Sequence, residues 1–286
     1  NVLRMLSKPC PPERLIKVLN DGLEQYDLIR SKRILLDQTL RGAVDALAES
    51  LSTAKPLFFG RVQRVRRMAK ELAMKQDVPN AWRVDVASVF SQLAYLALPE
   101  NVTEDVYYRR DLSKEVKALL AKFPEDTRNI LNKIPGLEEV GEILKSVDVQ
   151  YRFEEEKEDG VRLAASILKV ALDFDYYEEQ GYNRSIIVST LKERNKDYDP
   201  KITQSLSDLI VIAEETSTLQ EIKIDDIDIG MRLSQELKLD DGFLIAAAGT
   251  DVDRQLLKVI RNYNSCYAES PFPKRVQVIV PVNLLK

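Results

Sequence analysis

The chain contains no histidine among its 286 residues. Histidine is the usual base that activates a serine or cysteine nucleophile, and its imidazole is the commonest metal ligand in proteins. Its absence therefore excludes nucleophile activation by histidine and every metal site that depends on imidazole. A binuclear metallohydrolase centre built on imidazole cannot be assembled from this sequence.

Cysteine is almost as scarce, and long apolar runs are missing. Cys10 and Cys266 are the only two thiols and lie far apart, so we expect both to be free and reduced, as in a cytoplasmic protein. No run in the sequence approaches the ~18 consecutive apolar residues of a membrane-spanning helix. No signal peptide is visible either. We therefore expect a cytoplasmic protein that does not insert into a membrane.

The chain also lacks an excess of positive charge. Its 42 Lys and Arg residues stand against 46 Asp and Glu residues, which gives a net charge of -4. Nucleic-acid binding depends on a basic surface, so this balance argues against a DNA or RNA partner. With 44% hydrophobic and 31% charged residues, the chain suits a globular protein of about two domains.

A long apolar seam is the first feature that the sequence does contain. Between about residues 13 and 52, apolar side chains recur at steps of three, four or seven, which places them on one helix face, as in a coiled coil. A helix of ~40 residues exceeds ordinary globular length, so we favour a seam between two parallel copies of the chain. The seam residues are Leu19, Tyr26, Ile29, Leu36, Leu40 and Leu47. The alternative is two shorter helices packed on the following domain.

The next predicted helix, Leu57–Gln76, carries four arginines. Its apolar residues share one face, and the arginines lie on its other faces: Arg61, Arg64, Arg66 and Arg67. Such a cluster can bind phosphate or a nucleotide. We favour the plainer interpretation, a solvated helix face with local ion pairs.

Helical patterns continue along most of the chain, which predicts a mostly α fold. They cover Trp82–Tyr95, Lys114–Lys122, Pro124–Lys133, Leu137–Tyr151, Leu163–Tyr177, Ile186–Asn195 and Lys201–Glu214. The acidic segment Arg152–Gly160 is interpreted as a solvated linker. Four carboxylates cluster near Asp175, and we favour a charged helix end over a weak Mg²⁺ site. They are Asp173, Asp175, Glu178 and Glu179.

The pattern changes near the C-terminus. Thr216–Gln220 is polar and predicted to be a linker. Beyond it, Asp241-Gly242 is a hairpin signal. A helix is predicted over Val252–Tyr263 and a strand over Val276–Val280. We therefore expect a small α+β module at 221–286, packed on the helical domain and without recognisable site chemistry.

Several short motifs resemble the HD-GYP family, metal-dependent phosphohydrolases of bacterial signalling. The most specific is FPEDTRNILNKIPGLEEVGEILKSV, which begins at Phe123, and Leu98-Pro99, Phe174-Asp175 and Tyr198-Asp199-Pro200 also match. The resemblance covers about Leu57–Glu215 and implies an HD-type helical bundle. The C-terminal region resembles the β-containing tail beside some HD-type regulators.

The resemblance also implies that the family's catalytic residues are replaced. Arg61 aligns with a histidine, Ser91-Gln92 with the His-Asp pair, and Tyr95 with a lysine. Phe123 aligns with another histidine, and Leu172 with a metal-binding aspartate. The family's His-His-Glu falls on Val147-Asp148-Val149. The pocket positions are thus Arg61, Ser91, Gln92, Tyr95, Phe123, Val147, Asp148 and Leu172. We expect no metal, no cofactor and no catalysis, and a pocket filled by these bulkier side chains.

The first residues resemble the end of a response-regulator receiver domain. Lys8-Pro9 match the Lys-Pro that follows the receiver's last strand. The alternative is an ordinary loop that enters a helix at Pro12. The predicted domains are a receiver remnant at 1–26, a linker helix at 27–54, a degenerate HD-GYP-like domain at 55–215 and the module at 221–286.

Together these features predict a non-catalytic output module of a two-component response regulator. It would act as a homodimer or through a signalling protein partner, downstream of a histidine kinase. The alternative is a sensor that binds cyclic di-GMP without hydrolysing it. A third option is residual phosphodiesterase activity with rebuilt ligands.

Overall fold

The computed structural model describes residues 11–108, 110–147, 160–240, 242–266 and 273–281. The chain divides into two compact units, Asn1–Leu47 and Ala48–Lys286. The receiver-like Lys8 and Pro9 lie outside the described residues. None of the helices in these ranges is long and apolar enough to cross a membrane.

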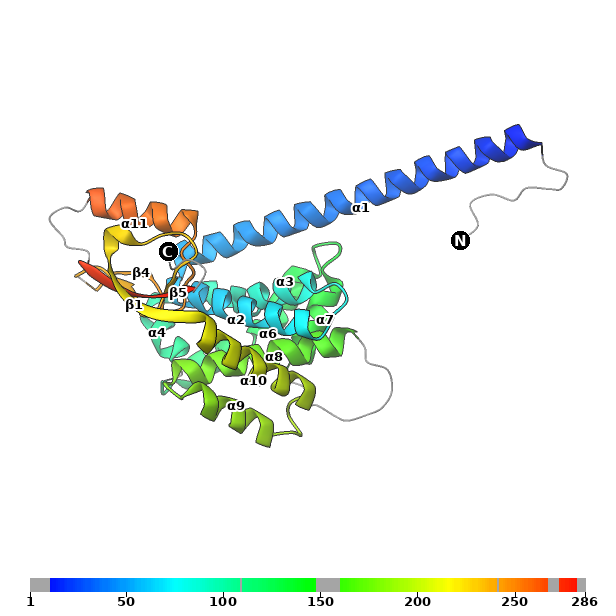
Figure 1. Ribbon diagram of the computed structural model, residues 1–286. Coiled ribbons are helices and arrows are strands. Elements are labelled where there is room, and N and C mark those ends of the chain that lie inside the picture. Colours follow the sequence, from blue (N-terminus) through cyan, green and yellow to red (C-terminus); the bar gives the residue numbers. More distant parts are fainter. Residues whose placement is uncertain (1–10, 109, 148–159, 241, 267–272, 282–286) are drawn as a thin grey trace. The chain divides into compact units, whose positions relative to one another are not determined.

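The N-terminal helix α1, Pro12–Ala54, is continuous over 43 residues (Figure 1). The prediction of one long helix is therefore confirmed, and the alternative of two shorter helices is wrong. Pro12 is its first residue, where the missing N–H would have no helical partner in any case. Large apolar side chains are exposed along it: Leu15, Ile16, Leu19, Leu23, Tyr26, Leu28, Ile29, Ile34, Leu35 and Leu36. Farther along, Leu40 is buried and Leu47 half-buried.

A bundle of helices, here called the helical domain, follows α1. Its elements are α2 Pro56–Lys75, α3 Trp82–Leu93, η1 Ala94–Ala97, α4 Glu100–Tyr107, α5 Lys114–Leu120, α6 Phe123–Leu131, α7 Glu138–Ser146, α8 Gly160–Glu179, α9 Arg184–Glu193 and α10 Pro200–Thr216. Helix α2 packs against both α3 and α8, and α7 packs against the same two helices. Phe58, Phe90 and Leu168 are wholly buried at this centre.

The starts of the last two helices follow from side-chain caps. Asn183 accepts a hydrogen bond from the Ser185 backbone N–H at 2.9 Å and caps α9. Asp199 accepts from Lys201 N–H at 2.7 Å and caps α10, with Pro200 in the first turn. Such caps satisfy backbone donors that the helix leaves without partners. The predicted helix start at Tyr198-Asp199-Pro200 is confirmed.

The remaining residues form the C-terminal module. Its elements are β1 Ser217–Lys223, η2 Ile224–Asp226, β2 Arg232–Leu233, β3 Leu237–Lys238, β4 Leu244–Ala246, α11 Arg254–Cys266 and β5 Arg275–Pro281. An antiparallel sheet in the order β1-β5-β2 has its own core, which includes Leu233, Ile260 and Val278. The predicted hairpin is confirmed, because β3 pairs with β4 and Gly242 turns between them at φ 88°.

The predicted linker at Thr216–Gln220 is wrong. Strand β1 begins at Ser217, directly after α10, and pairs with β5 from Ser217↔Pro281 to Lys223↔Arg275. The segment is polar because much of it stays in contact with water, and Leu219 is 63% exposed. Its partner strand lies far away in the sequence, so local pattern does not reveal the pairing.

Two glycines let the C-terminal module lie directly on α2. A Cβ at Gly60 would come within 2.5 Å of the Cβ of Ala247. A Cβ at Gly249, where φ is +76°, would collide with the side chain of Arg64. Only glycine permits such close approach at both places. The module is therefore packed on the helical domain, as the sequence predicts.

Candidate functional site

Two arginines of α2 share one buried carboxylate on α8. Arg61 Nε lies 3.1 Å from Asp175 Oδ2, and Arg64 Nε lies 2.5 Å from Asp175 Oδ1. Arg64 also pairs with Glu179 at 2.9 Å. Asp175 is only 2% exposed and each arginine 8%. The prediction of a solvated arginine face is therefore wrong at these two positions, because their partner comes from a helix more than a hundred residues away.

Further donors of these arginines are also occupied. Arg61 Nη2 donates to the Tyr107 carbonyl at 3.2 Å, and its guanidinium lies 4.3 Å from the Tyr107 ring centroid. Arg64 donates to the Tyr107 hydroxyl at 2.8 Å and to the Ala248 carbonyl at 2.5 Å. We call this group, with Asp175, the Asp175 cluster. These contacts hold both guanidinium groups in the protein interior.

Burial dominates the acid–base behaviour of the cluster. Burial raises the pKa of the Tyr107 hydroxyl well above its usual value, although the Arg64 charge opposes this. Burial acts most strongly on Arg64 and lowers its pKa, but the charge and hydrogen bond of Asp175, together with Tyr107 and Glu179, outweigh it, and the net pKa is raised. Arg64 is thus held in its charged form and Tyr107 in its neutral form.

The other carboxylates of the predicted charged helix end have separate partners. Asp173 accepts a hydrogen bond from Tyr198 at 2.8 Å, and Glu178 pairs with Arg184 at 2.6 Å. Within the described ranges, no group of three or more His, Cys, Asp or Glu side chains is placed to hold a metal ion.

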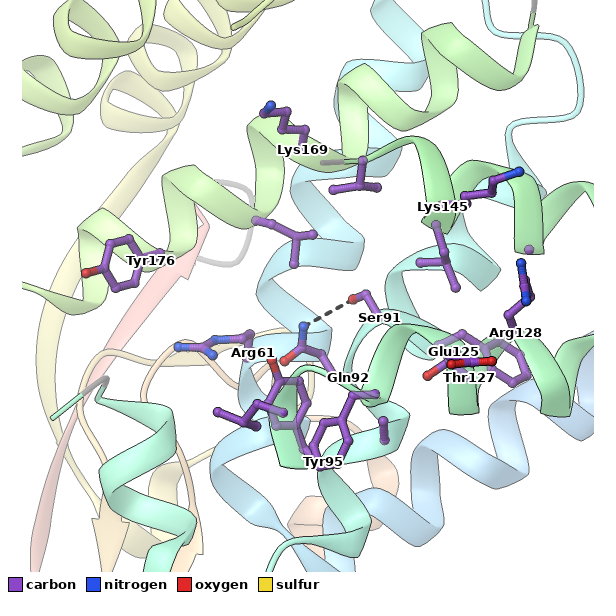
Figure 2. A pocket seen from close by; sticks show the side chains of 18 of the residues that line it. Arg61, Ser91, Gln92, Tyr95, Glu125, Thr127, Arg128, Lys145, Lys169 and Tyr176 are labelled. Atoms are coloured by element: carbon purple, nitrogen blue, oxygen red, sulfur yellow. Dashed lines mark hydrogen bonds between the residues drawn. The ribbon is translucent and has the colours of Figure 1, made fainter. Parts of the chain in front are cut away.

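A pocket of about 650 Å³ lies beside the Asp175 cluster, between α2, α3, η1, α6, α7 and α8 (Figure 2). The fold brings seven of the predicted positions together in its lining: Arg61, Ser91, Gln92, Tyr95, Phe123, Val147 and Leu172. The eighth, Asp148, lies outside the described residues. The packing of these helices therefore brings residues that are distant in the sequence around one cavity.

The expectation that bulky side chains fill this pocket is wrong. Tyr95 lies flat against Phe58, with ring centroids 4.4 Å apart and planes inclined by 13°. Phe123 meets the Tyr95 ring edge-on at 5.4 Å and is itself only 7% exposed. The aromatic rings thus pack on one another along the wall and leave the space in front of them open.

A short chain of hydrogen bonds in the pocket ends at the side-chain oxygen of Gln92, for which the described residues supply no donor. Ser91 Oγ donates to the Ser88 carbonyl at 2.7 Å, so its remaining capacity is as an acceptor. Gln92 Nε2 donates to that same Oγ at 3.2 Å. This chain fixes the orientation of the Gln92 amide, and Oε1 is left buried with no hydrogen-bond partner among the described residues. Figure 2 shows the Ser91–Gln92 bond.

Several polar residues of the pocket escaped the sequence interpretation. They are Glu125, Thr127, Arg128, Lys145, Lys169, Asp173 and Tyr176. Helical spacing could have predicted two of them. Lys169 and Tyr176 lie three residues before and four residues after Leu172, so they share its helix face. Arg128 and Lys145 needed the packing of α6 beside α7 to become neighbours of one cavity.

The fold and the pocket together define a helical domain with a central cavity between its helices. A family profile for the HD domain matches residues 45–202, more than half of the chain, and the chain belongs to the HD domain family. The match contains α2 to α9 and every described pocket residue. A search of curated proteins found no match.

Proposed function

We propose that the protein is a non-catalytic signalling module built on an HD domain. The observation that carries the proposal is the Arg61–Asp175 pair. By the family resemblance, Arg61 stands where a metal-binding histidine is expected, and Asp175 holds its positive charge in place. A divalent cation entering the pocket would meet this fixed charge and be repelled.

The other residues at the expected ligand positions support the same proposal. Ser91 and Gln92 are neutral, Phe123 is aromatic, and Val147 and Leu172 are aliphatic. Hard divalent cations require several carboxylate or carbonyl oxygens, of which these residues supply only the Gln92 amide oxygen, and first-row metals prefer imidazole or thiolate ligands. These residues do not fit a metal ion, so we assign no metal-dependent step to them.

The proposed output is self-association through α1. Its exposed apolar residues include Leu15, Leu19, Tyr26, Ile29 and Leu36, which lie at heptad spacing on one face. Contiguous exposed apolar surface of this kind usually marks an interaction site. A second copy of the same helix matches the seam by symmetry, and closed symmetric dimers are the commonest assemblies. Phosphorylation of an upstream receiver, to which Lys8-Pro9 point, would then act on this dimer.

Three measurements on the wild-type protein test the proposal. The protein is purified from cells supplied with manganese and iron, and its metal content is determined by elemental analysis, together with hydrolysis of bis-p-nitrophenyl phosphate. We expect substoichiometric metal and no turnover above a no-protein control. Stoichiometric metal accompanied by turnover would overturn the absence of catalysis. Sedimentation that finds only monomer at tens of micromolar would overturn the dimer.

A further inference from the structure

The pocket contains a buried acceptor that the protein itself does not satisfy. Gln92 is 4% exposed, and its Oε1 has no hydrogen-bond partner among the described residues. Most buried polar groups in folded proteins are hydrogen-bonded, and leaving one without a partner costs about 1–3 kcal/mol. The hydrogen bonds of Ser91 fix which end of the amide is free, so the missing partner is a donor. Gln92 lines the cavity, so a ligand donor that reaches Oε1 can supply the missing bond while Nε2 keeps its bond to Ser91.

Positive side chains line another side of the same cavity. Arg128 on α6 and Lys145 on α7 line the pocket, and Figure 2 shows both on the side away from Arg61. Arg128 forms no ion pair within the described ranges. Among the described residues, Lys145 pairs only with the exposed Glu142, at 3.5 Å, and exposed pairs of this kind contribute little. An anionic group at this side would therefore meet two available cations.

Between the Gln92 oxygen and the two cations, most of the wall is apolar or aromatic, and Glu125 and Thr127 of α6 also line the cavity near Arg128 (Figure 2). The apolar and aromatic part is formed by Phe90, Tyr95, Phe123, Leu144, Val147 and Leu172. The volume of about 650 Å³ lies within the range of pockets that enclose small-molecule ligands. A mostly apolar cavity with a few polar groups at defined places is the usual design of such sites.

We propose that this pocket binds a one-ended organic anion. The ligand carries a carboxylate, sulfonate or phosphate toward Arg128 and Lys145. Its apolar, ring-shaped body lies along the aromatic wall, and an N–H or O–H at the opposite end donates to Gln92 Oε1. The proposal concerns binding alone and does not depend on the dimer or on the absence of hydrolysis.

The test uses 6-(p-toluidino)naphthalene-2-sulfonate as the probe, because its sulfonate and its single N–H donor stand at opposite ends of a fused ring. We expect one saturable site per chain in a fluorescence titration of the wild-type protein. The variant Gly141→Leu places a side chain in the cavity, since a Cβ at Gly141 meets no atom within 4 Å. Loss of a charge-assisted hydrogen bond costs about 1.5–3 kcal/mol, so Arg128→Gln should weaken binding by about tenfold or more. Gly141→Leu should weaken binding at least as much.

Two further variants complete the test. Gln92→Met removes the orphan acceptor at nearly constant volume, and it should weaken binding without lowering the melting temperature. Lys133→Gln is the matched control: it removes one positive charge just after α6, at an exposed position that does not line the pocket. It should leave the dissociation constant within about twofold, because a rim charge outside the site contributes little. Circular dichroism verifies that each variant is folded.

Competition identifies the ligand chemistry. Displacement of the probe by guanosine monophosphate points to a phosphate ligand, and displacement by indole-3-acetate to a carboxylate ligand; either supports the proposal. Three outcomes overturn it. The first is that folded Gly141→Leu protein binds the probe as the wild type does. The second is that inorganic phosphate displaces the probe as well as the organic anions do. The third is that cyclic di-GMP displaces it and neither one-ended anion does.

Discussion

Arg61 Nε and Asp175 Oδ2 lie 3.1 Å apart in the interior of the helical domain, and Arg61 also lines the pocket. The same carboxylate holds Arg64, which reaches the Ala248 carbonyl of the C-terminal module at 2.5 Å. One buried aspartate thus links the pocket wall, the α2–α8 contact and the docking of the module.

Asp175→Asn should be strongly destabilising. The substitution leaves two buried guanidinium groups without their shared countercharge, and breaking a buried ion pair from one side costs about 3–5 kcal/mol. Urea denaturation measures the loss. Asp208→Asn is the control, because the Asp208–Lys75 pair is exposed and worth less than about 1 kcal/mol. Equal losses for the two variants would contradict the role given to Asp175.

Phe123→Ala should destabilise the protein by about 3 kcal/mol, near the lower limit for truncating a buried phenylalanine. The side chain is 7% exposed and meets the edge of the Tyr95 ring, but it borders an open cavity that already lacks packing on one side. Ile130→Ala, at a 42% exposed position on the same helix, serves as the comparison in thermal and urea unfolding. The expectation fails if Phe123→Ala costs no more than Ile130→Ala.

Gln92→Met should leave stability unchanged or raise it. Methionine keeps the volume and removes the orphan acceptor, and replacing an unsatisfied polar group by an apolar one is nearly neutral or stabilising. The Ser91 hydroxyl keeps its own bond to the Ser88 carbonyl. The melting temperature of the ligand-free protein is the measurement. A clear fall would mean that Oε1 has a partner in the free protein.

Ile29→Glu with Leu36→Glu should convert the proposed dimer into monomers. Both side chains are exposed on α1, at 65% and 48%, and stand one heptad apart on the seam. Charges at these positions would be buried without partners in a dimer. Ser31→Glu with Gln38→Glu adds the same charges to the same helix but two positions away from the seam. Sedimentation velocity should find monomers for the first pair of changes only, and any other pattern contradicts the seam.

Much of the architecture could be predicted from local sequence. The single helix α1, the start of α10 at Asp199-Pro200 and the turn at Gly242 follow from periodicity, capping and backbone freedom. Seven of the positions that the family resemblance singled out line one pocket. Each of these features depends either on residues that are close together in the chain or on a short sequence motif that still resembles the family.

The missed features depend on partners that are distant in the chain. Strand β1 exists because β5, about sixty residues later, pairs with it along its whole length. Arg61 and Arg64 leave the solvent because Asp175 lies opposite them on another helix. Neither the polar pattern of β1 nor the spacing of the arginines contains that information.

By itself, the sequence determined that no imidazole chemistry is available, that the fold is mostly helical, and that a long apolar seam begins the described chain. Composition and periodicity are properties of the chain that no packing can change. Only the tertiary structure decided that the pocket stays open, because Tyr95 lies flat on Phe58 instead of crossing the cavity. It also decided which polar atoms are satisfied, since the partner of Arg61 and the lack of one for Gln92 Oε1 both depend on how α2, α3 and α8 pack.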